Sequence, residues 1–282
     1  MEEHEGGEVL NSVPRAFLFD VDGVISDPGE KRITTDGLSE AIASRINQGD
    51  IVSLNTGRSL SWLIEHDVIG SIERAVTDKT KLADLIAVGE KGGTWLTYEN
   101  GGWKTNIDEG IKVPERLKGT IRNLIESEFS DSMFYDTSKI TMISTEMIDK
   151  YDIPTFTKRQ QDILVPRMNE ILTRPDYKNL DLKIDPTTIA TDIQDKQVGK
   201  HFGARRIVRW LQEKGIKPEH FITIGDSQSD SEMAEELQDE YSTEFVFVGD
   251  PAKFNQDKLR CKIVMPEKRF GEGTLEYLKT LD

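Results

Sequence analysis

The sequence predicts an α/β protein in which a doubly wound parallel sheet is interrupted by a second, α+β domain. Short apolar runs near both ends of the chain alternate with segments of helical periodicity, and this order predicts parallel strands joined by helices. The middle of the chain instead alternates apolar and polar residues, which is typical of an antiparallel sheet with one solvated face. The 282 residues are enough for two such domains.

The first half of the core begins with the apolar run at residues 16–19, which is typical of a strand buried on both faces. Apolar residues at helical spacing predict a helix over 35–47, and Gly49 has the position of its C-cap. Residues 51–54 form the next predicted strand. Ser59 is expected to cap the helix that follows this strand.

The same order returns late in the chain. Helices are predicted over 201–214 and 231–237, and strands over 221–224 and 245–248, each strand being followed by Gly-Asp. Strand, helix and strand at these spacings imply parallel pairing. We therefore expect a Rossmann-like core that is built from both ends of the chain.

The middle of the chain is expected to fold separately. Helices are predicted over 114–128 and 156–172, and strands over 139–143 and 180–184. The helices would cover one face of the antiparallel sheet that these strands begin to form.

The expected domain boundaries follow from this change of pattern. Residues 14–92 and 193–282 are assigned to the core, and residues 93–192 to the inserted α+β domain. Residues 1–13 are acidic and lack periodicity, so they are expected to be a disordered tail.

Composition limits the classes of partner and of location. The formal charge of −15, from 51 acidic and 36 basic residues, repels nucleic acid phosphates, so no nucleic acid partner is expected. No run approaches the roughly 20 apolar residues of a spanning helix, and the start is acidic rather than basic and then apolar. The single cysteine, Cys261, allows no disulfide within the chain. We expect a cytoplasmic monomer or homodimer with no membrane partner.

Two carboxylates follow the first predicted strand. In open parallel sheets ligands bind at the carboxyl ends of the strands, which is where Asp20 and Asp22 fall. Residues i and i+2 of an extended chain point the same way, and Gly23 then permits a sharp turn and a close approach to a ligand. One carboxylate could act as nucleophile and the other as general acid or base. Asp-Gly turns are common, however, so this motif alone is weak evidence for a catalytic site.

A second acidic pair follows the strand at 221–224. Asp226 comes directly after this buried strand, and Asp230 lies near the start of the next helix, where negative charge is favourable. Several carboxylates at one edge repel each other unless a cation joins them. Oxygen ligands without a His or Cys cluster indicate Mg²⁺ rather than Zn²⁺.

Three further groups are candidates for binding a phosphate. Thr56, Gly57 and Arg58 form a turn after the second strand, with a hydroxyl and backbone N–H groups available to a phosphate oxygen. Lys200 begins a helix, where a cation opposes the helix dipole unless an anion holds it. Lys196, four residues earlier, is the competing candidate for this role.

Four motifs in the correct order make the sequence resemble the haloacid dehalogenase superfamily, in the branch with a large α+β cap. Phe-Asp20-Val-Asp22-Gly-Val is similar to its first motif, Leu-Asn-Thr56-Gly-Arg to the second, Lys200 to the third and Gly-Asp226 through Asp230 to the fourth. The resemblance implies that the inserted domain is the cap. It also implies Asp20 as nucleophile and Asp22 as acid and base, with Thr56 and Lys200 on the phosphate. Mg²⁺ would be held by Asp20, the Asp22 carbonyl and Asp226, with Asp230 in support.

Two positions depart from the family pattern. Relatives often have Glu-Asn-Gly where this chain has Glu90-Lys91-Gly92, and Asn-Asp where it has Ser229-Asp230. Lys91 could supply charge to the substrate, although a solvated surface lysine is the default interpretation.

The sequence thus predicts a Mg²⁺-dependent phosphatase that hydrolyses a small phosphate monoester, such as a sugar phosphate, through an aspartyl-phosphate intermediate. A phosphosugar mutase similar to the phosphomannomutases is the alternative, since it would share the aspartyl phosphate. A non-catalytic sensor on the same scaffold is a third possibility, against which the intact Asp20 and Asp22 argue. The predicted partner is a small phosphorylated metabolite.

Overall fold

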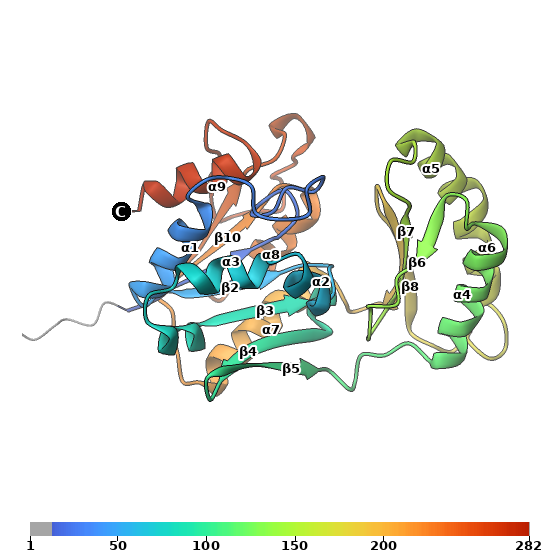
Figure 1. Ribbon diagram of the computed structural model, residues 1–282, viewed down its shortest axis with the longest axis horizontal. Helices are drawn as coiled ribbons and strands as arrows, with labels where there is room; N and C mark the ends of the chain where they lie inside the picture. Colours follow the sequence, from blue (N-terminus) through green and yellow to red (C-terminus); the bar gives the residue numbers. More distant parts are fainter. Residues whose placement is uncertain (1–12, 282) are drawn as a thin grey trace, which may run out of the picture.

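The structure is a computed structural model that describes residues 13–281. The predicted disordered tail lies outside the described residues, except for the exposed Val13. Figure 1 shows two bodies joined by two connections, with the larger body formed from both ends of the chain and the smaller one from its middle. Among the described residues, no helix is both long and apolar enough to cross a membrane.

The larger body is built on an eight-stranded mixed sheet. Six strands are parallel with β1 in the interior, and a hairpin extends the sheet in the antiparallel sense. Strands from both ends of the chain therefore meet at β1, as expected for a doubly wound fold. In spatial order the strands are β12 (Lys262–Val264), β11 (Thr243–Phe247), β10 (His220–Gly225), β1 (Arg15–Phe19), β2 (Ile51–Asn55), β3 (Leu85–Gly89), β4 (Thr94–Glu99) and β5 (Gly102–Ile107).

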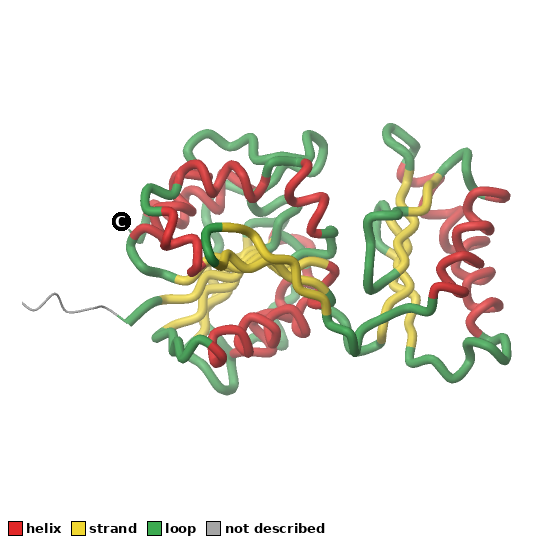
Figure 2. The backbone as a smooth tube through the Cα atoms, turned by 60° about the horizontal axis from the view of Figure 1, so that its bottom comes forward, coloured by secondary structure: helices red, strands yellow, loops and turns green. Residues whose placement is uncertain are grey.

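Helices cover both faces of this sheet, because alternate residues of each parallel strand point to opposite faces. On β1, Phe17 and Phe19 join one apolar cluster, while Ala16 and Leu18 join another on the opposite face. Figure 2 shows helical segments on both sides of the strands. The covering helices are α1 (Leu38–Asn47), α2 (Leu60–Glu65), α3 (Val68–Ala75), α7 (Lys200–Glu213), α8 (Ser231–Leu237) and α9 (Phe270–Lys279).

The smaller body is an antiparallel sheet with helices on one face only, and we call it the cap. Its apolar cluster includes Leu117, Phe156 and Met168 from the helices and Ile193 from the sheet. The opposite face of the sheet turns toward the larger body (Figure 1). The strands in spatial order are β6 (Met133–Tyr135), β7 (Ile143–Met147), β9 (Ala190–Asp195) and β8 (Leu182–Pro186), and the helices are α4 (Glu115–Glu128), α5 (Ile153–Arg159) and α6 (Val165–Leu172).

This architecture confirms the predicted α/β class with a doubly wound core and an α+β insertion, and several local features differ from expectation. The hairpin β4–β5 pairs with β3 in the larger sheet, although residues 93–107 had been expected in the insertion. We therefore propose crossings after Ile107 and near Asp195. The predicted strand at 139–143 lies almost entirely in a loop, because Ile140 and Thr141 donate their N–H groups to Glu90 instead of to a strand.

Candidate active site

Asp20 lies at the carboxyl end of β1, in the middle of the larger sheet. Its N–H donates to the carbonyl of Ile224 at 2.9 Å, which extends the pairing of β1 with β10 by one residue. The residue is buried, with 8% of its surface exposed. Beyond it the chain turns at Gly23, whose φ of +77° lies in the left-handed region that favours glycine. The expected turn after the first motif is therefore present.

Lys200 holds one oxygen of Asp20. Its ammonium donates to Asp20 Oδ1 and, at 2.8 Å, to the carbonyl of Asn55, and it lies 2.9 Å from Asp230 Oδ1. Burial acts to lower the pKa of Lys200, but Asp20 and Asp230 outweigh it and raise the pKa above its usual range. Asn55, which the sequence analysis did not assign to the site, donates its amide N–H to the Lys200 carbonyl at 2.8 Å. Lys196 is excluded from this role, because it pairs with Asp181 on the surface.

The second acidic pair lies beside Asp20 at the end of β10. Asp230 is fully buried, and its Oδ2 accepts from the N–H groups of Asp226 and Ser227 at 3.1 and 2.9 Å. Asp230 therefore supports the turn that carries Asp226. Burial alone would raise the pKa of Asp230, but Lys200 and Ser227 lower it below its usual value. Ser229 is exposed, with its hydroxyl 3.0 Å from that of Ser227.

Three carboxylates converge at this point. Asp20, Asp226 and Asp230 each offer an oxygen, and these atoms all lie within 4.8 Å of one another. Burial and then Asp230 raise the pKa of Asp226 to about 7, and the same two causes raise the pKa of Asp20 well above its usual value. Lys200 supplies only one positive charge to this cluster. A further cation would relieve the remaining repulsion.

The donor set fits a hard divalent cation such as Mg²⁺. All three groups are carboxylates, which Mg²⁺ prefers, and no thiolate or imidazole is among them. Asp230 already accepts three hydrogen bonds at Oδ2 and pairs with Lys200, whereas no hydrogen bond to the Asp226 carboxylate is found among the described residues. Asp20 and Asp226 are therefore the better candidates for direct ligands, with Asp230 behind them.

Arg58 links Asp22 to the cap. Its guanidinium donates to both oxygens of Asp22, at 2.9 and 3.1 Å, and to Oε2 of Glu146 at 3.3 Å. It also lies over the ring of Trp62, at 4.7 Å from the centroid. In this structure the guanidinium is engaged by two carboxylates rather than left free for a phosphate. The arrangement orients Asp22, which was not foreseen from the sequence.

The turn at Thr56 and Gly57 lies next to these groups. Thr56 is buried, and its hydroxyl oxygen accepts from the Arg58 N–H at 3.1 Å. The Gly57 carbonyl accepts from the ammonium of Lys139, a cap residue, at 2.6 Å. The helix α2 begins just beyond, where Ser59 accepts from the Trp62 N–H at 3.2 Å and so caps the helix as expected.

The core and cap together enclose a cavity of about 340 Å³ over the carboxylates. Its core lining includes six of the residues singled out in the sequence, while Thr56, Lys200 and Asp230 are buried and do not line it. Cap side chains could not be placed here from the sequence, apart from the alternation that puts Ser144 and Glu146 on one face of β7. The lining consists of Asp20, Asp22, Pro28, Gly57, Arg58, Lys91, Asp226 and Ser227 from the core and Lys139, Ser144, Glu146, Thr187, Thr188, Ile189, Ala190 and Asp192 from the cap.

Lys91 is not the solvated surface lysine that the sequence favoured. Only 13% of its side chain is exposed, and its ammonium lies 2.7 Å from Asp185 and 3.1 Å from Asp192, both in the cap sheet. Its neighbour Glu90 is also buried and accepts the N–H groups of Ile140 and Thr141. The segment Glu90-Lys91-Gly92 thus contributes to the contact between core and cap, beside Arg58 and Lys139.

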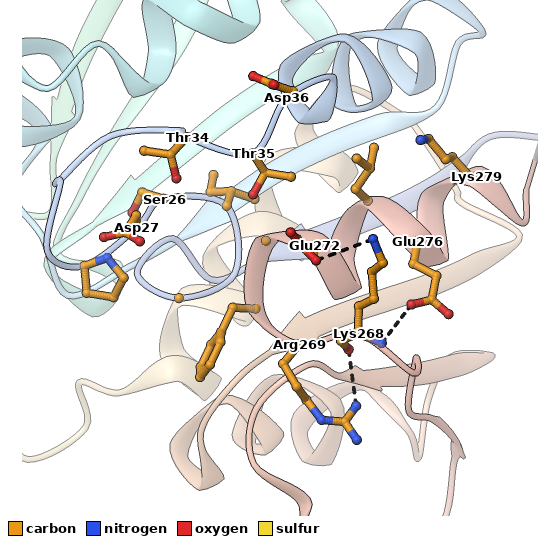
Figure 3. A pocket seen from close by; sticks show the side chains of 16 residues that line it. Ser26, Asp27, Thr34, Thr35, Asp36, Lys268, Arg269, Glu272, Glu276 and Lys279 are labelled. Atoms are coloured by element: carbon orange, nitrogen blue, oxygen red, sulfur yellow. Dashed lines mark hydrogen bonds and ion pairs between the residues drawn. The ribbon is translucent and has the colours of Figure 1, made fainter.

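A larger cavity, of about 860 Å³, lies outside the candidate site. Figure 3 shows the hydroxyl groups of Thr34 and Thr35 on a loop that faces α9, where Lys268 pairs with Glu272. Gly23 lines this cavity, but the three clustered carboxylates do not. The smaller cavity is therefore the candidate active site.

Solved structures with the same architecture are found among several phosphatases. The C-terminal domain of the Candida albicans trehalose-6-phosphate phosphatase aligns with a TM-score of 0.63 at 15% identity, over 95% of this chain and 91% of that one. A haloacid dehalogenase-like hydrolase of Bacteroides thetaiotaomicron aligns with a TM-score of 0.62 at 10% identity, over 95% and 100%. This chain has the haloacid dehalogenase-like fold. The sucrose-phosphatase of Synechocystis sp. PCC6803, solved with sucrose and phosphate, has a TM-score of 0.54 at 13% identity, over 96% and 98%.

Sequence comparison gives a weaker signal than the comparison of structures. No protein-family model matches it. Over 242 residues it is 24% identical to the alpha,alpha-trehalose-phosphate synthase (UDP-forming) 5 of Arabidopsis thaliana, which covers 83% of this chain. The chain spans 25% of the length of that relative. The likeness therefore concerns one part of a longer protein.

Proposed function

We propose that this chain is a phosphatase that moves the phosphoryl group of a small phosphate monoester first to Asp20 and then to water. One observation carries this proposal. Lys200 holds one oxygen of the buried Asp20, and the other oxygen has no hydrogen bond within the described residues. Asp22, two residues on, lines the same cavity. Asp20 and Asp22 are thus suited to be a nucleophile and an acid–base partner.

In the first step, the free oxygen of Asp20 attacks phosphorus. A phosphorus–oxygen bond forms to Asp20 as the bond to the leaving group breaks, and Asp22 gives its proton to the departing oxygen. Lys200, the Thr56 hydroxyl and the Gly57 N–H stabilise charge on the phosphoryl oxygens, since the N–H groups of Thr56 and Arg58 already donate within the protein. Arg58 donates to both oxygens of Asp22 in this structure, so one of these hydrogen bonds must be released when Asp22 carries the proton, while the other orients the carboxyl.

In the second step, water attacks the phosphorus of the aspartyl phosphate. Asp22 takes a proton from this water, the bond between phosphorus and Asp20 breaks, and inorganic phosphate leaves. The cap excludes other water while the intermediate exists. Mg²⁺ would be held by Asp20 and Asp226, with the Asp22 carbonyl contributing and Asp230 in support, and it would supply positive charge to the phosphoryl oxygens.

The leaving group that we propose is a sugar or another polyol. The cap side of the cavity presents Ser144, Glu146 and Asp192, which are oxygen-bearing groups that accept hydrogen bonds from hydroxyls. Structural neighbours named as trehalose-6-phosphate phosphatase and sucrose-phosphatase support the same class. A sugar phosphate is therefore the proposed substrate, and the cap is proposed to select it.

A panel of phosphorylated metabolites tests this function. Purified protein is incubated with trehalose 6-phosphate, sucrose 6-phosphate and other sugar phosphates, with Mg²⁺ or with EDTA, and released phosphate is measured. We expect Mg²⁺-dependent release from at least one sugar phosphate. Isomerisation of the sugar without phosphate release would contradict the proposal and would indicate a mutase.

Substitution of the nucleophile completes this test. Asp20→Asn should abolish turnover without loss of folding, because it removes one of three crowded carboxylates. Asp36→Asn is the matched control, since Asp36 is exposed in the same loop region and should leave turnover unchanged. Full activity of Asp20→Asn would reject Asp20 as the nucleophile.

A further inference from the structure

The open face of the cap sheet carries two carboxylates that repel each other. Asp192 and Asp185 are direct partners across β9 and β8, and Ser144 is the partner of Asp192 on β7. Residues directly opposite in antiparallel strands lie on the same face, where like charges are destabilising. Gln194 donates to Asp185 at 3.2 Å but carries no charge. Within the described part of the cap, no cation pairs with Asp185 or Asp192.

The missing cation comes from the core. The Lys91 ammonium donates to Asp185 at 2.7 Å, to Asp192 at 3.1 Å and to the side-chain oxygen of Gln194 at 3.2 Å. The side chains of Asp192 and Lys91 are 8% and 13% exposed, so water replaces little of their ion pair, whereas Asp185 is 40% exposed and its pair with Lys91 is partly screened. Separation of the cap from the core would leave the facing carboxylates without their cation.

The backbone presents Lys91 toward the cap in a fixed direction. Glu90, Lys91 and Gly92 all have left-handed φ values, of +50°, +54° and +111°, and the first two are not glycine. Such strain persists only where surrounding contacts impose it. Here the Lys91 N–H donates to the Thr56 carbonyl and the Glu90 N–H to the Arg58 carbonyl, each at 2.9 Å. The turn is thereby tied to the loop that lines the active site.

We propose that Lys91 is a positioning residue that fixes the closed position of the cap, and thereby places Ser144 and Asp192 over Asp20. The role as a determinant of substrate selection rests on the proposed function, but the closing contact itself does not. Charge complementarity supports this proposal, since the acidic cap face meets a second core cation where Arg58 pairs with Glu146. The Lys91 contacts select one position of the cap sheet, because two carboxylates and an amide must be met by one ammonium.

A distance measurement on substrate-free protein tests the closing contact without using activity. In a Cys261→Ser background, spin labels are placed at the exposed positions Ile163 in the cap and Lys217 in the core. Pulsed electron paramagnetic resonance then gives the distribution of distances between the two domains. We expect a narrow distribution that broadens toward longer distances in Lys91→Met. An unchanged distribution in Lys91→Met would overturn the proposal.

Three further variants sharpen the result. Lys91→Arg keeps the cation and should keep the narrow distribution. Asp185→Asn combined with Asp192→Asn removes the two negative charges that Lys91 meets on the cap side, so it should broaden the distribution even if Lys91→Met does not fold. Lys104→Met is the matched control, because Lys104 pairs with Glu99 on the hairpin β4–β5 rather than with the cap. Broadening in Lys104→Met equal to that in Lys91→Met would also contradict the proposal.

Kinetics test the consequence for the substrate. On the sugar phosphate identified by the panel, Lys91→Met should lower kcat/KM about tenfold or more, because truncating one partner of a buried ion pair leaves the others uncompensated. On p-nitrophenyl phosphate, whose leaving group lacks hydroxyls for the cap, we expect a change within about twofold. Equal losses on both substrates would indicate direct contact of Lys91 with the phosphate and would overturn the positioning role. If no sugar phosphate is hydrolysed, the proposed function fails while the distance measurement still decides the closing contact.

Discussion

Gly23 lies at φ +77°, and a Cβ placed on it would come within 2.4 Å of Oδ2 of Asp226. Gly23→Ala should therefore impose two costs. The left-handed backbone costs about 1–2 kcal/mol with an alanine, and the displaced Asp226 should no longer bind Mg²⁺ normally. We expect lower stability in thermal unfolding, together with loss of Mg²⁺-dependent phosphate release and of stabilisation by Mg²⁺.

Gly215→Ala separates the two effects of the Gly23 substitution. Gly215 has a similar φ of +68°, but no heavy atom lies within 4 Å of its added Cβ. Gly215→Ala should therefore lose only the stability that the left-handed backbone conformation costs, and it should respond normally to Mg²⁺. If both variants keep the same response to Mg²⁺ as the original chain, the close approach of Gly23 to Asp226 has no bearing on the metal site.

Asp226 should make the stability of the metal-free protein depend on pH. Burial, together with Asp230, raises the pKa of Asp226 to about 7, above the value of about 3.9 that an unfolded chain has. The folded state thus binds more protons than the unfolded state between these values, so this contribution to stability falls as pH rises through 7. In EDTA, the original chain should lose stability relative to Asp226→Asn between pH 5 and pH 8.

The same comparison in Mg²⁺ should reverse the order of the two proteins at pH 8. A divalent cation binds the ionised carboxylate and stabilises the folded state, and the asparagine variant lacks that ligand. Denaturant unfolding at each pH, with and without Mg²⁺, gives the four free energies of unfolding. Parallel curves for the two proteins in EDTA would show that Asp226 keeps an ordinary pKa.

The positions of individual lysines in the structure could be predicted from the sequence only in part. Lys200 and Lys196 were both candidates because they lie only four residues apart, and only the fold shows that Lys200 reaches Asp20 while Lys196 pairs with Asp181. Lys91 was interpreted as solvated because its partners, Asp185 and Asp192, lie more than ninety residues away. Contacts between domains leave no local pattern in the sequence.

Glu90 joins the segment before β4 to the cap loop at 136–142. Its carboxylate accepts the N–H groups of Ile140 and Thr141 and the hydroxyl of Thr141, and it is 1% exposed. In Glu90→Gln, the NH₂ group of the glutamine would face one of these donors. We expect a loss of about 2 kcal/mol and faster amide hydrogen exchange at Ile140 and Thr141.

A surface glutamate provides the control for this effect. Glu99 accepts from Thr97 and Lys104 on the hairpin β4–β5, and its side chain is 46% exposed. Glu99→Gln should change stability by no more than about 0.5 kcal/mol. Exchange rates at Ile140 and Thr141 that stay the same in Glu90→Gln would show that the cap loop is held by other contacts.

Regular elements were predicted best where one strong periodicity determined them. The helix at 231–237 matches α8, and the helix at 114–128 matches α4 within one residue. The helix expected at 156–172 is present as one continuous helical segment that starts earlier, at Ile153, and contains a π-helical turn over residues 160–164 between α5 and α6. The strand expected at 139–143 failed because its N–H groups serve Glu90, a tertiary interaction that overrides local propensity.

The division of the chain shows the limit of pattern reasoning for the molecule as a whole. Alternation of apolar and polar residues begins at Thr94, and an antiparallel hairpin gives the same alternation whether it extends the core sheet or begins the cap. The motifs that predicted the candidate site lie at strand ends and turns of the parallel core, so the fold class was enough to bring them together. No such rule predicts which cap side chains lie over the candidate site.

The acidity of the chain should act on every phosphorylated ligand that approaches it. A formal charge of −15 repels a dianionic phosphate ester, and three of the cations beside the candidate site, Lys200, Arg58 and Lys91, are each paired with carboxylates. Added salt screens repulsion between exposed charges over about 10 Å at 0.1 M, whereas buried pairs are screened less. The free energy of approach therefore becomes less unfavourable as ionic strength rises, while the contacts inside the site persist.

We accordingly expect kcat/KM for the active sugar phosphate to rise between 20 and 200 mM KCl, at about constant free Mg²⁺, with kcat changing less. The direction of this salt effect is opposite to that for a basic protein, in which added salt weakens the attraction of phosphates. Measurement in NaCl controls for a specific effect of K⁺. A steady fall of kcat/KM with salt would mean that local cations, rather than the net charge, dominate the field that the substrate meets. In that case the repulsion from the exposed surface carboxylates would contribute little at the cavity. The substrate would instead be attracted chiefly by the cations where core and cap meet.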